Sequence, residues 1–265
     1  GIYSFLLWDL FRNFTDNKIL IKLFLIILIG IVVVGSLVEF PYYKIYEENS
    51  KRSKADPEYE LSDTGVFDEN KYYDIFTEYA KVDMDDIYIK VTVVNKGPIT
   101  ATLDVLPTVW FRNFWSYVQD DDYKPKLSYS GPDKILIEHR DLGNYYLYFE
   151  GRPTLLFCNN ETNHSKVYGH KTKKGYWKDG INDYVVHGSK KAVNPKFEGT
   201  KAALQYICLL EPGESTTIRL RLSNIHDKTP FRDFDEKFEM RQNEADVFYG
   251  DIQKDITLED DKLVQ

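Results

Sequence analysis

The chain is poor in the residues that nucleic-acid-binding and disulfide-stabilised proteins need. Among its 265 residues there are 34 Lys and Arg against 42 Asp and Glu, which gives a formal net charge of -8. Neutralising a phosphate backbone requires clustered basic residues in excess, so this balance argues against a nucleic-acid partner. Two cysteines, Cys158 and Cys208, do not make a disulfide framework, and we expect both to be buried thiols.

Sequence motifs for phosphate, acyl-transfer and metal chemistry are missing as well. The chain contains no glycine-rich phosphate-binding loop and no G-x-S-x-G nucleophile elbow. Its histidines lie far apart and lack Cys or Glu at ligand spacing, so we predict no zinc site and no cofactor. These histidines are His139, His164, His170, His187 and His226.

Aromatic residues, in contrast, are abundant. With 20 Tyr, 16 Phe and 4 Trp they make up 15% of the chain, and apolar residues in total make up 43%. Aromatic side chains favour β-strands, and they also stack on planar ligands and sugars. The composition therefore predicts a globular, mainly β protein with ample apolar material for a core.

The longest apolar run lies in the N-terminal segment, residues 1–39. Residues 19–38, ILIKLFLIILIGIVVVGSLV, have Lys22 as their one charge and are long enough as a helix to cross a hydrocarbon core of about 30 Å. We therefore predict a transmembrane helix here and a membrane as a partner. A cleaved signal peptide fits less well, because the run is long and no A-x-A-like site follows.

Another interpretation of this apolar run stays open. Because the chain begins with Gly1 and not Met, residues 19–38 could be the mis-joined end of a gene fragment. Basic residues on the two sides of the run are nearly balanced, so the positive-inside rule gives no orientation. The expected location is membrane-associated if the run is native, and cytoplasmic otherwise.

Residues 40–225 show the alternation of β-strands. In DIYIKVTVVN, apolar residues recur at every second position, and Asn95-Lys96-Gly97-Pro98 then supplies a turn before residues 101–110 resume the pattern. A second pair, residues 202–210 and 216–222, is joined through Glu211-Pro212-Gly213-Glu214. We predict an antiparallel hairpin at each place.

Three further strands are expected between these pairs, at residues 134–139, 144–150 and 154–158. Many short strands with no intervening helix predict an antiparallel β-sandwich over residues 40–225. In residues 226–265, Thr229-Pro230 is typical of a helix start, and aromatic residues follow at three- and four-residue steps. We expect one C-terminal helix whose aromatic stripe packs on the sandwich, followed by an acidic linker.

Three segments concentrate polar, glycine and aromatic residues in a way that plain strands do not. They are DPEYELSDTGVFDENKYYDIF, PTVWFRNFWSY and WKDGINDYVVHGSKKAVNPKFEGTKAA. In PTVWFRNFWSY, the side chains of Trp110, Arg112, Asn113 and Trp115 could stack on pyranose rings and bond their hydroxyls. The alternative is that the tryptophans fill the core between the sheets, as they commonly do in sandwiches. We favour that alternative for one tryptophan and leave the pair open.

The third segment, WKDGINDYVVHGSKKAVNPKFEGTKAA, offers Lys178, Asp179, Asp183 and His187. Two carboxylates about 5–5.5 Å apart could act as the pair of a retaining glycosidase, but sequence spacing cannot place them at that distance. An Asp-Gly turn and a solvated Asp are the simpler interpretation. We therefore treat these residues as candidate carbohydrate contacts and name no catalytic residue.

Five long motifs occur in order and resemble one family. They are DPEYELSDTGVFDENKYYDIFTEYAK, NKGPITATLDVLPTVWFRNFWSY, HRDLGNYYLYFEG, LLFCNNETN and KDGINDYVVHGSKKAVNPKFEGTKAA. Together they are similar to the β-sandwich region of proteins related to mannosyl-oligosaccharide glucosidase, glycoside hydrolase family 63. The resemblance spans about residues 40–249, and the series of motifs is much more specific than any single one.

In that family the sandwich precedes an (α/α)6 barrel that bears the acidic catalytic residues. The resemblance therefore implies a parent protein that hydrolyses α-glucosidic bonds of an oligosaccharide with inversion, through a barrel that this chain lacks. None of the family's catalytic residues has a counterpart here. The front of the chain departs from the family, whose members have further sandwich strands where this chain has its apolar run.

Three hypotheses follow. The first is a non-catalytic β-sandwich portion of a glucosidase-like glycoside hydrolase. The second is a membrane-anchored carbohydrate-binding module without hydrolase activity. The third, a complete enzyme, would require a carboxylate pair such as Asp179 and Asp183.

Overall fold

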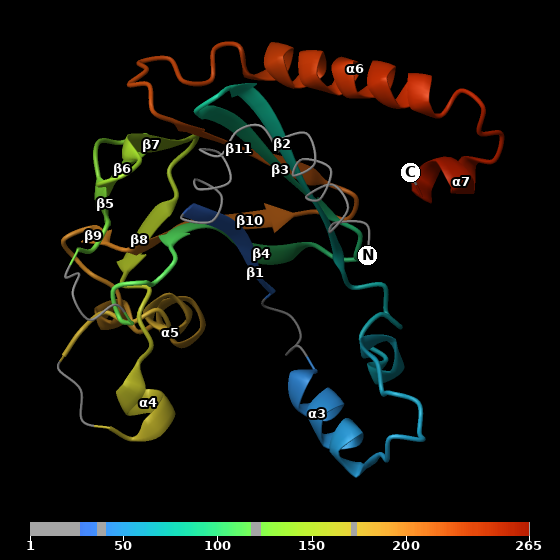
Figure 1. Ribbon diagram of the computed structural model, residues 1–265. Helices are drawn as coiled ribbons and strands as arrows, with labels where there is room; N and C mark the ends of the chain where they lie inside the picture. Colours follow the sequence, from blue (N-terminus) through green and yellow to red (C-terminus); the bar gives the residue numbers. More distant parts are fainter. Residues whose placement is uncertain (1–26, 36–40, 118–122, 171–173, 265) are drawn as a thin grey trace.

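The protein consists of two antiparallel β-sheets packed face to face (Figure 1). The computed structural model describes residues 27–35 (backbone only), 41–117, 123–170 and 174–264. This architecture confirms the prediction of a mainly β, antiparallel fold.

Seven strands form the larger sheet. In spatial order they are β2 (Tyr73–Asp83), β3 (Asp86–Asn95), β11 (Ser215–Ser223), β7 (Gly143–Phe149), β6 (Lys134–His139), β5 (Lys126–Tyr129) and β9 (Glu198–Gly199). Four strands form the smaller sheet, in the order β1 (Ile27–Gly35), β4 (Ala101–Phe111), β10 (Lys201–Leu210) and β8 (Thr154–Cys158). The strands expected from the alternating pattern all exist, with ends within about two residues of the expected ones.

The core lies between the two sheets and follows from the period-two alternation. Val91 and Val93 of β3, Val105 of β4 and Leu204 of β10 have no exposed surface and belong to one apolar cluster. Each such side chain stabilises the fold by about 1.5–3 kcal/mol through removal from water.

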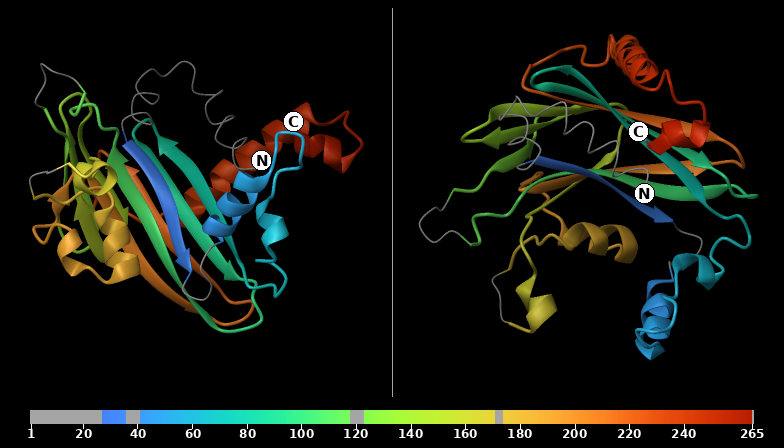
Figure 2. Two further views of the ribbon diagram at one scale, coloured as in Figure 1. Left: turned by 90° about the horizontal axis from the view of Figure 1, so that it is seen from below. Right: turned by 45° about the vertical axis from the view of Figure 1, so that its right-hand side comes forward.

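Helices are more numerous than the sequence suggested. They are α3 (Tyr42–Lys51), α4 (His164–Tyr168), α5 (Gly180–His187), α6 (Phe234–Ile252) and α7 (Glu259–Val264), with the 3-10 turns η1 (Leu61–Thr64) and η2 (Lys190–Ala192). The prediction of one helix after residue 40 was therefore wrong. Figure 2 shows α3, α4 and α5 on the side of the four-stranded sheet and α6 on the side of the seven-stranded sheet.

Both predicted hairpins were wrong, although their strands are correct. β3 and β4 belong to different sheets, and so do β10 and β11, so each short loop crosses from one sheet to the other. Asn95, whose side chain is buried, joins the two crossings: its Nδ2 donates to the carbonyl oxygens of Ile99 (2.9 Å) and Leu210 (3.0 Å). Turn residues therefore marked the loops correctly but did not determine which strand pairs with which.

The predicted transmembrane helix over residues 19–38 is wrong where the structure describes it. Residues 27–35 form strand β1, which pairs antiparallel with β4 from Ile27↔Phe111 to Gly35↔Leu103. A β-branched run such as IVVV favours a strand, and the edge of β4 offers unpaired backbone groups to such a run. The rest of the predicted helix lies outside the described residues. In the part of the chain that the structure describes, none of the helices has the length and apolarity needed to span a bilayer.

The C-terminal helix begins later than its expected start at Thr229-Pro230. α6 begins at Phe234, and the preceding residues form a loop in which the Thr229 N–H donates to Asp227 (2.9 Å). Its aromatic stripe packs on the sheet at the amino-terminal end, where Phe234 is buried and Phe238 packs beside it. At the other end Phe248 is half exposed, so the packing face does not extend along the whole helix.

Candidate functional site

Two segments that are distant in sequence meet at one end of the four-stranded sheet. The loop after β4 (residues 112–117) lies against the segment after β8 (residues 159–163), because Asn160 Nδ2 donates to the carbonyl oxygen of Phe111 (2.8 Å). The Lys178 N–H donates to the carbonyl oxygen of Glu161 (3.1 Å), which brings in the start of α5. We call residues 112–117, 159–168 and 176–187 the α4–α5 face. Seven of the eight candidate contact residues lie within this face, although His187 lies at the far end of α5. The eighth, Trp110, borders the face as the last residue but one of β4.

Trp115 is used by the fold. Its ring packs against the core between the sheets, and its Nε1 donates to Glu161 Oε1 at 2.7 Å. Lys124 Nζ also lies 2.7 Å from the same oxygen. The position of Trp115 fits the interpretation of a core tryptophan whose polar atom orients a carboxylate.

The other residues of the first segment are more accessible. Trp110 is half-buried and alternates with the buried Phe111, so its side chain lies on the outer face of the four-stranded sheet. Arg112 is exposed, with its guanidinium carbon 4.9 Å from the centre of the Phe114 ring. Asn113 shapes the turn, because its Nδ2 donates to Ser116 Oγ (2.9 Å) and its Oδ1 accepts from the Ser116 N–H (3.1 Å).

Asp179 and Asp183 are brought together by a lysine that sequence reasoning did not single out. Lys166 Nζ of α4 lies 3.2 Å from Asp179 Oδ2 and 2.9 Å from Asp183 Oδ1. Its hydrogen bonds to Asp183 and Asp179 raise the pKa of Lys166 above its ordinary value. Asn163 Nδ2 donates to Asp179 Oδ2 as well, at 3.2 Å. The two carboxylates are thus held as partners of one ammonium group.

Tight packing fixes the position of α5 under these side chains. A Cβ atom on Gly180 would lie 2.2 Å from the carbonyl oxygen of Ala192, so only glycine allows the helix start to approach η2 this closely. One residue on, Ile181 is buried with Leu106 and Leu156 on the outer face of the four-stranded sheet. The carboxylates therefore stand on a rigid support.

Lys178 and His187 are not part of this cluster of charges. Both side chains are exposed, and His187 lies at the last turn of α5, about 12 Å along the helix from Asp179. A surface that used Asp179, Asp183 and His187 together would need a ligand as long as the helix.

Glu161, Asn163 and Lys166 are the residues that sequence reasoning missed. Glu161 and Asn163 lie in LLFCNNETN, one of the motifs that carry the family resemblance, but the motif assigned them no role. Their roles arise from contacts with Trp115 and Asp179, which lie 46 and 16 residues away. Within the described ranges, no group of three or more His, Cys, Asp or Glu side chains could hold a metal ion.

Both cysteines are free, and they differ in burial. Cys158 is buried as expected, whereas Cys208 is only half-buried. Burial raises the pKa of the Cys158 thiol to about 12, so it stays protonated and unreactive at neutral pH.

No family model matches the chain. It is similar to an uncharacterized protein of Saccharomyces cerevisiae, with 30% identity in an alignment 259 residues long. The match covers 80% of this chain and 24% of that protein. The chain thus spans about a quarter of the length of its curated relative. Among solved structures, a polysaccharide lyase superposes with a TM-score of 0.36 and 14% identity, over 60% of this chain and 21% of the lyase. A likeness this low supports no inference about function.

Proposed function

We propose that the chain is the non-catalytic β-sandwich portion of a glucosidase-like glycoside hydrolase, whose parent protein hydrolyses α-glucosidic bonds in oligosaccharides. The observation that carries the proposal is the ordered series of five long motifs over residues 40–249 that resemble the sandwich of glycoside hydrolase family 63. Two findings support it. The same residues form an antiparallel sandwich, and the chain is similar to a quarter of a much longer protein.

The geometry of the carboxylates also favours a supporting role. A glycosidase needs one carboxyl group that can hold a proton at working pH and a second that remains charged and accessible. Asp179 and Asp183 instead share Lys166 Nζ, at 3.2 and 2.9 Å, so both carboxylates already have an ionic partner. In this proposal the catalytic acid and base belong to the (α/α)6 barrel of the parent.

The contribution of the sandwich would be to support that barrel and to lend loops to the rim of its sugar cleft. The α4–α5 face is the best candidate for the rim, because it gathers exposed polar groups on a rigid support. Arg112 and Lys178 are exposed there, and Asp183 is half-buried beside Lys166. Groups of this kind bond sugar hydroxyls.

A second candidate function is a carbohydrate-binding module without hydrolase activity. The observation in its favour is a group of accessible aromatic rings after β4, where Phe114 is 48% and Tyr117 is 81% exposed beside the half-buried Trp110. Rings placed in this way can stack on pyranose faces. A membrane anchor is not part of this candidate, because residues 27–35 of the predicted helix form strand β1.

Assays of the chain alone separate these functions. Malto-oligosaccharides and an α-glucoside with a chromogenic leaving group would be offered, and both glucose release and binding by titration calorimetry would be measured. The first proposal predicts neither. Saturable binding that is lost in Trp110→Ala, with an unchanged circular dichroism spectrum, would favour the binding module. Hydrolysis that is abolished by Asp179→Asn and Asp183→Asn would overturn both in favour of a complete enzyme.

A further inference from the structure

Helix α6 is attached to the sandwich near its amino-terminal end. Phe234 stacks on Tyr88 with 4.9 Å between ring centres, and it is the one buried residue of the helix among those described. One guanidinium nitrogen of Arg219 donates to both carboxylate oxygens of Asp235, at 2.8 and 3.0 Å. Lys90 Nζ lies 4.7 Å from the centre of the Phe238 ring. Beyond that point Figure 1 shows α6 continuing toward α7.

One face of the helix borders an open hollow of about 540 Å³. The described residues that line it are all from α6: Glu236, Glu239, Met240, Asn243, Glu244 and Val247. Their spacing of three and four residues places them side by side along the helix.

The chemistry of this face is acidic and apolar. Met240 and Val247 provide an apolar stripe, and Val247 is 75% exposed. Glu244 pairs with Arg241 at 3.0 Å, an exposed pair that contributes little stability. Among the described residues, no Lys, Arg or His is within ion-pair distance of Glu236 or Glu239. An apolar stripe bordered by uncompensated carboxylates is complementary to a helix that presents apolar side chains bordered by Lys or Arg.

We propose that this face of α6 binds a basic amphipathic helix of another polypeptide. Apolar side chains of that helix contact Met240 and Val247, and its basic side chains pair with Glu236 and Glu239. A second copy of this chain is a poor partner, because α6 is itself acidic on this face and α7 begins with three acidic residues, so like charges would meet. The proposal does not depend on the glucosidase-like function.

Charge-reversed variants and a model peptide test the proposal. The probe is a labelled amphipathic peptide of about 18 residues, built from Leu and Lys. The control probe is the same peptide with Glu in place of Lys. Binding of each peptide to the whole chain is measured by fluorescence anisotropy. The double variant Glu236→Lys, Glu239→Lys should weaken binding of the Leu/Lys peptide about tenfold or more. Asp260→Lys, Asp261→Lys on α7, with the same change in net charge, should alter it less than about twofold.

A second pair of variants tests the apolar part of the face. Val247→Asp should weaken binding of the Leu/Lys peptide. Val264→Asp is the matched control, because Val264 on α7 is 76% exposed and Val247 is 75% exposed, and it should leave binding unchanged. Because both side chains are exposed, both variants should keep the melting temperature of the parent chain.

Three outcomes would overturn the proposal. Equal weakening by the α6 and α7 charge reversals would show attraction to the net charge of -8 rather than to this face. Binding of the Leu/Glu peptide as tight as that of the Leu/Lys peptide would contradict charge complementarity. A dimer in light scattering that the α6 reversal dissociates would identify a second copy as the occupant.

Discussion

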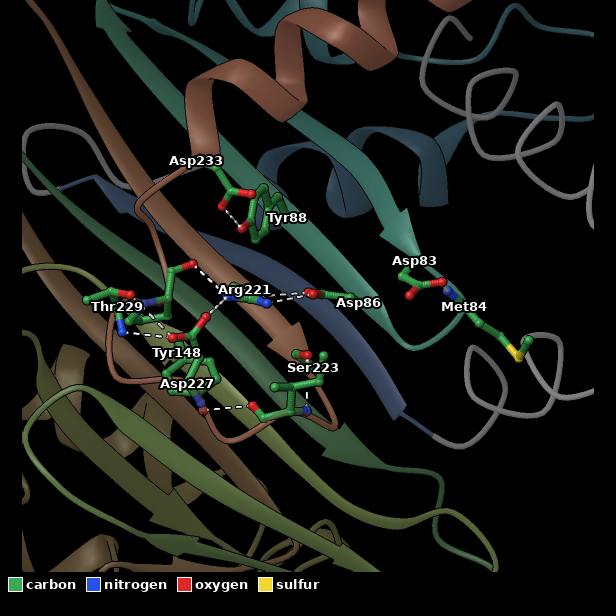
Figure 3. Close-up of polar contacts among 12 residues, drawn as sticks. Asp83, Met84, Asp86, Tyr88, Tyr148, Arg221, Ser223, Asp227, Thr229 and Asp233 are labelled. Carbon is green, nitrogen blue, oxygen red and sulfur yellow. Dashed lines mark hydrogen bonds and ion pairs between the residues drawn. The ribbon is translucent and has the colours of Figure 1, made fainter.

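Arg221 holds the loop before α6 on the outer face of the seven-stranded sheet (Figure 3). Its guanidinium donates to both oxygens of Asp86, at 2.8 and 2.6 Å, and its Nη1 donates to Asp227 (2.8 Å) and to the carbonyl oxygen of Pro230 (3.0 Å). Only 7% of the Arg221 side chain and 5% of the Asp86 side chain are exposed. Removing one partner would therefore leave a buried charge without compensation.

Arg221→Met should lower the free energy of unfolding by about 3–5 kcal/mol, the usual effect of breaking a buried ion pair from one side. Lys126→Met is the matched control, because Lys126 pairs with Glu198 at 2.7 Å with 51% and 39% of the two side chains exposed. That change should cost less than about 1 kcal/mol. Urea denaturation of both variants measures the difference, and similar losses in the two would contradict this role of Arg221.

Two carboxyl groups of the same loop make stability depend on pH. The Thr229 N–H and Arg221 lower the pKa of Asp227, and the Tyr88 hydroxyl, which lies 2.6 Å from Asp233, lowers the pKa of Asp233. A lowered folded-state pKa adds stability that is fully present above the unfolded-state pKa near 3.8 and is lost as the pH falls through the folded-state value.

We therefore expect the free energy of unfolding to fall between about pH 5 and pH 2. In the Asp233→Asn variant the free energy of unfolding should fall less steeply with pH over that range than in the parent chain, because the variant lacks one carboxyl group that takes up a proton on unfolding. Urea titrations at several pH values provide the measurement. An identical slope for the variant and the parent would show that Asp233 has the same pKa in the folded and unfolded states.

Among the elements, β1 shows most clearly where sequence reasoning succeeds and fails. The alternation of apolar residues located the strands of the sandwich, because the two faces of each strand have different surroundings. In residues 27–35 there is no alternation, and an apolar run of this kind fits a helix or a strand equally well. Pairing with β4 makes this run a strand. Because Ile31 pairs with Pro107, which lies 76 residues away, the neighbouring sequence does not indicate the pairing.

Amide hydrogen exchange tests this strand directly. The Phe111 N–H donates to the carbonyl oxygen of Thr200, so odd residues of β4 bond to β10 and even residues bond to β1. The amides of Leu28, Gly30, Val32 and Val34 pair with those even residues and should exchange slowly. Amides of the intervening residues face away from β4 and should exchange faster. Uniform protection over residues 27–35 would indicate a helix and contradict the strand.

At the scale of the whole molecule, the class of fold could be predicted from the sequence but the pairing of its sheets could not. The residues at Asn95 and Pro212-Gly213 indicate loops, yet a short loop can join neighbours in one sheet or cross between two. The side chain of Asn95 forms hydrogen bonds to residues of both crossings, Ile99 and Leu210. Leu210 lies 115 residues away in the sequence. Contacts of that range are invisible to local patterns.

The candidate site was predictable to a similar degree. Polar and aromatic composition led to the segments that contain Trp115, Asp179 and Asp183, and the structure brings these segments together. Glu161 and Lys166, which join them, are ordinary charged residues in the sequence. Their importance comes from the positions of α4 and α5 and not from any spacing that the sequence displays.

The central claim is that this sandwich belongs to a glucosidase-like hydrolase and does not catalyse the reaction itself. The most direct test is to express the full product of the gene beside this chain and to measure glucose release from α-glucosidic oligosaccharides by both. The account predicts release by the full product, with inversion at the anomeric carbon, and none by this chain. Release by this chain alone, or none from any α-glucosidic substrate by a folded full product, would contradict it.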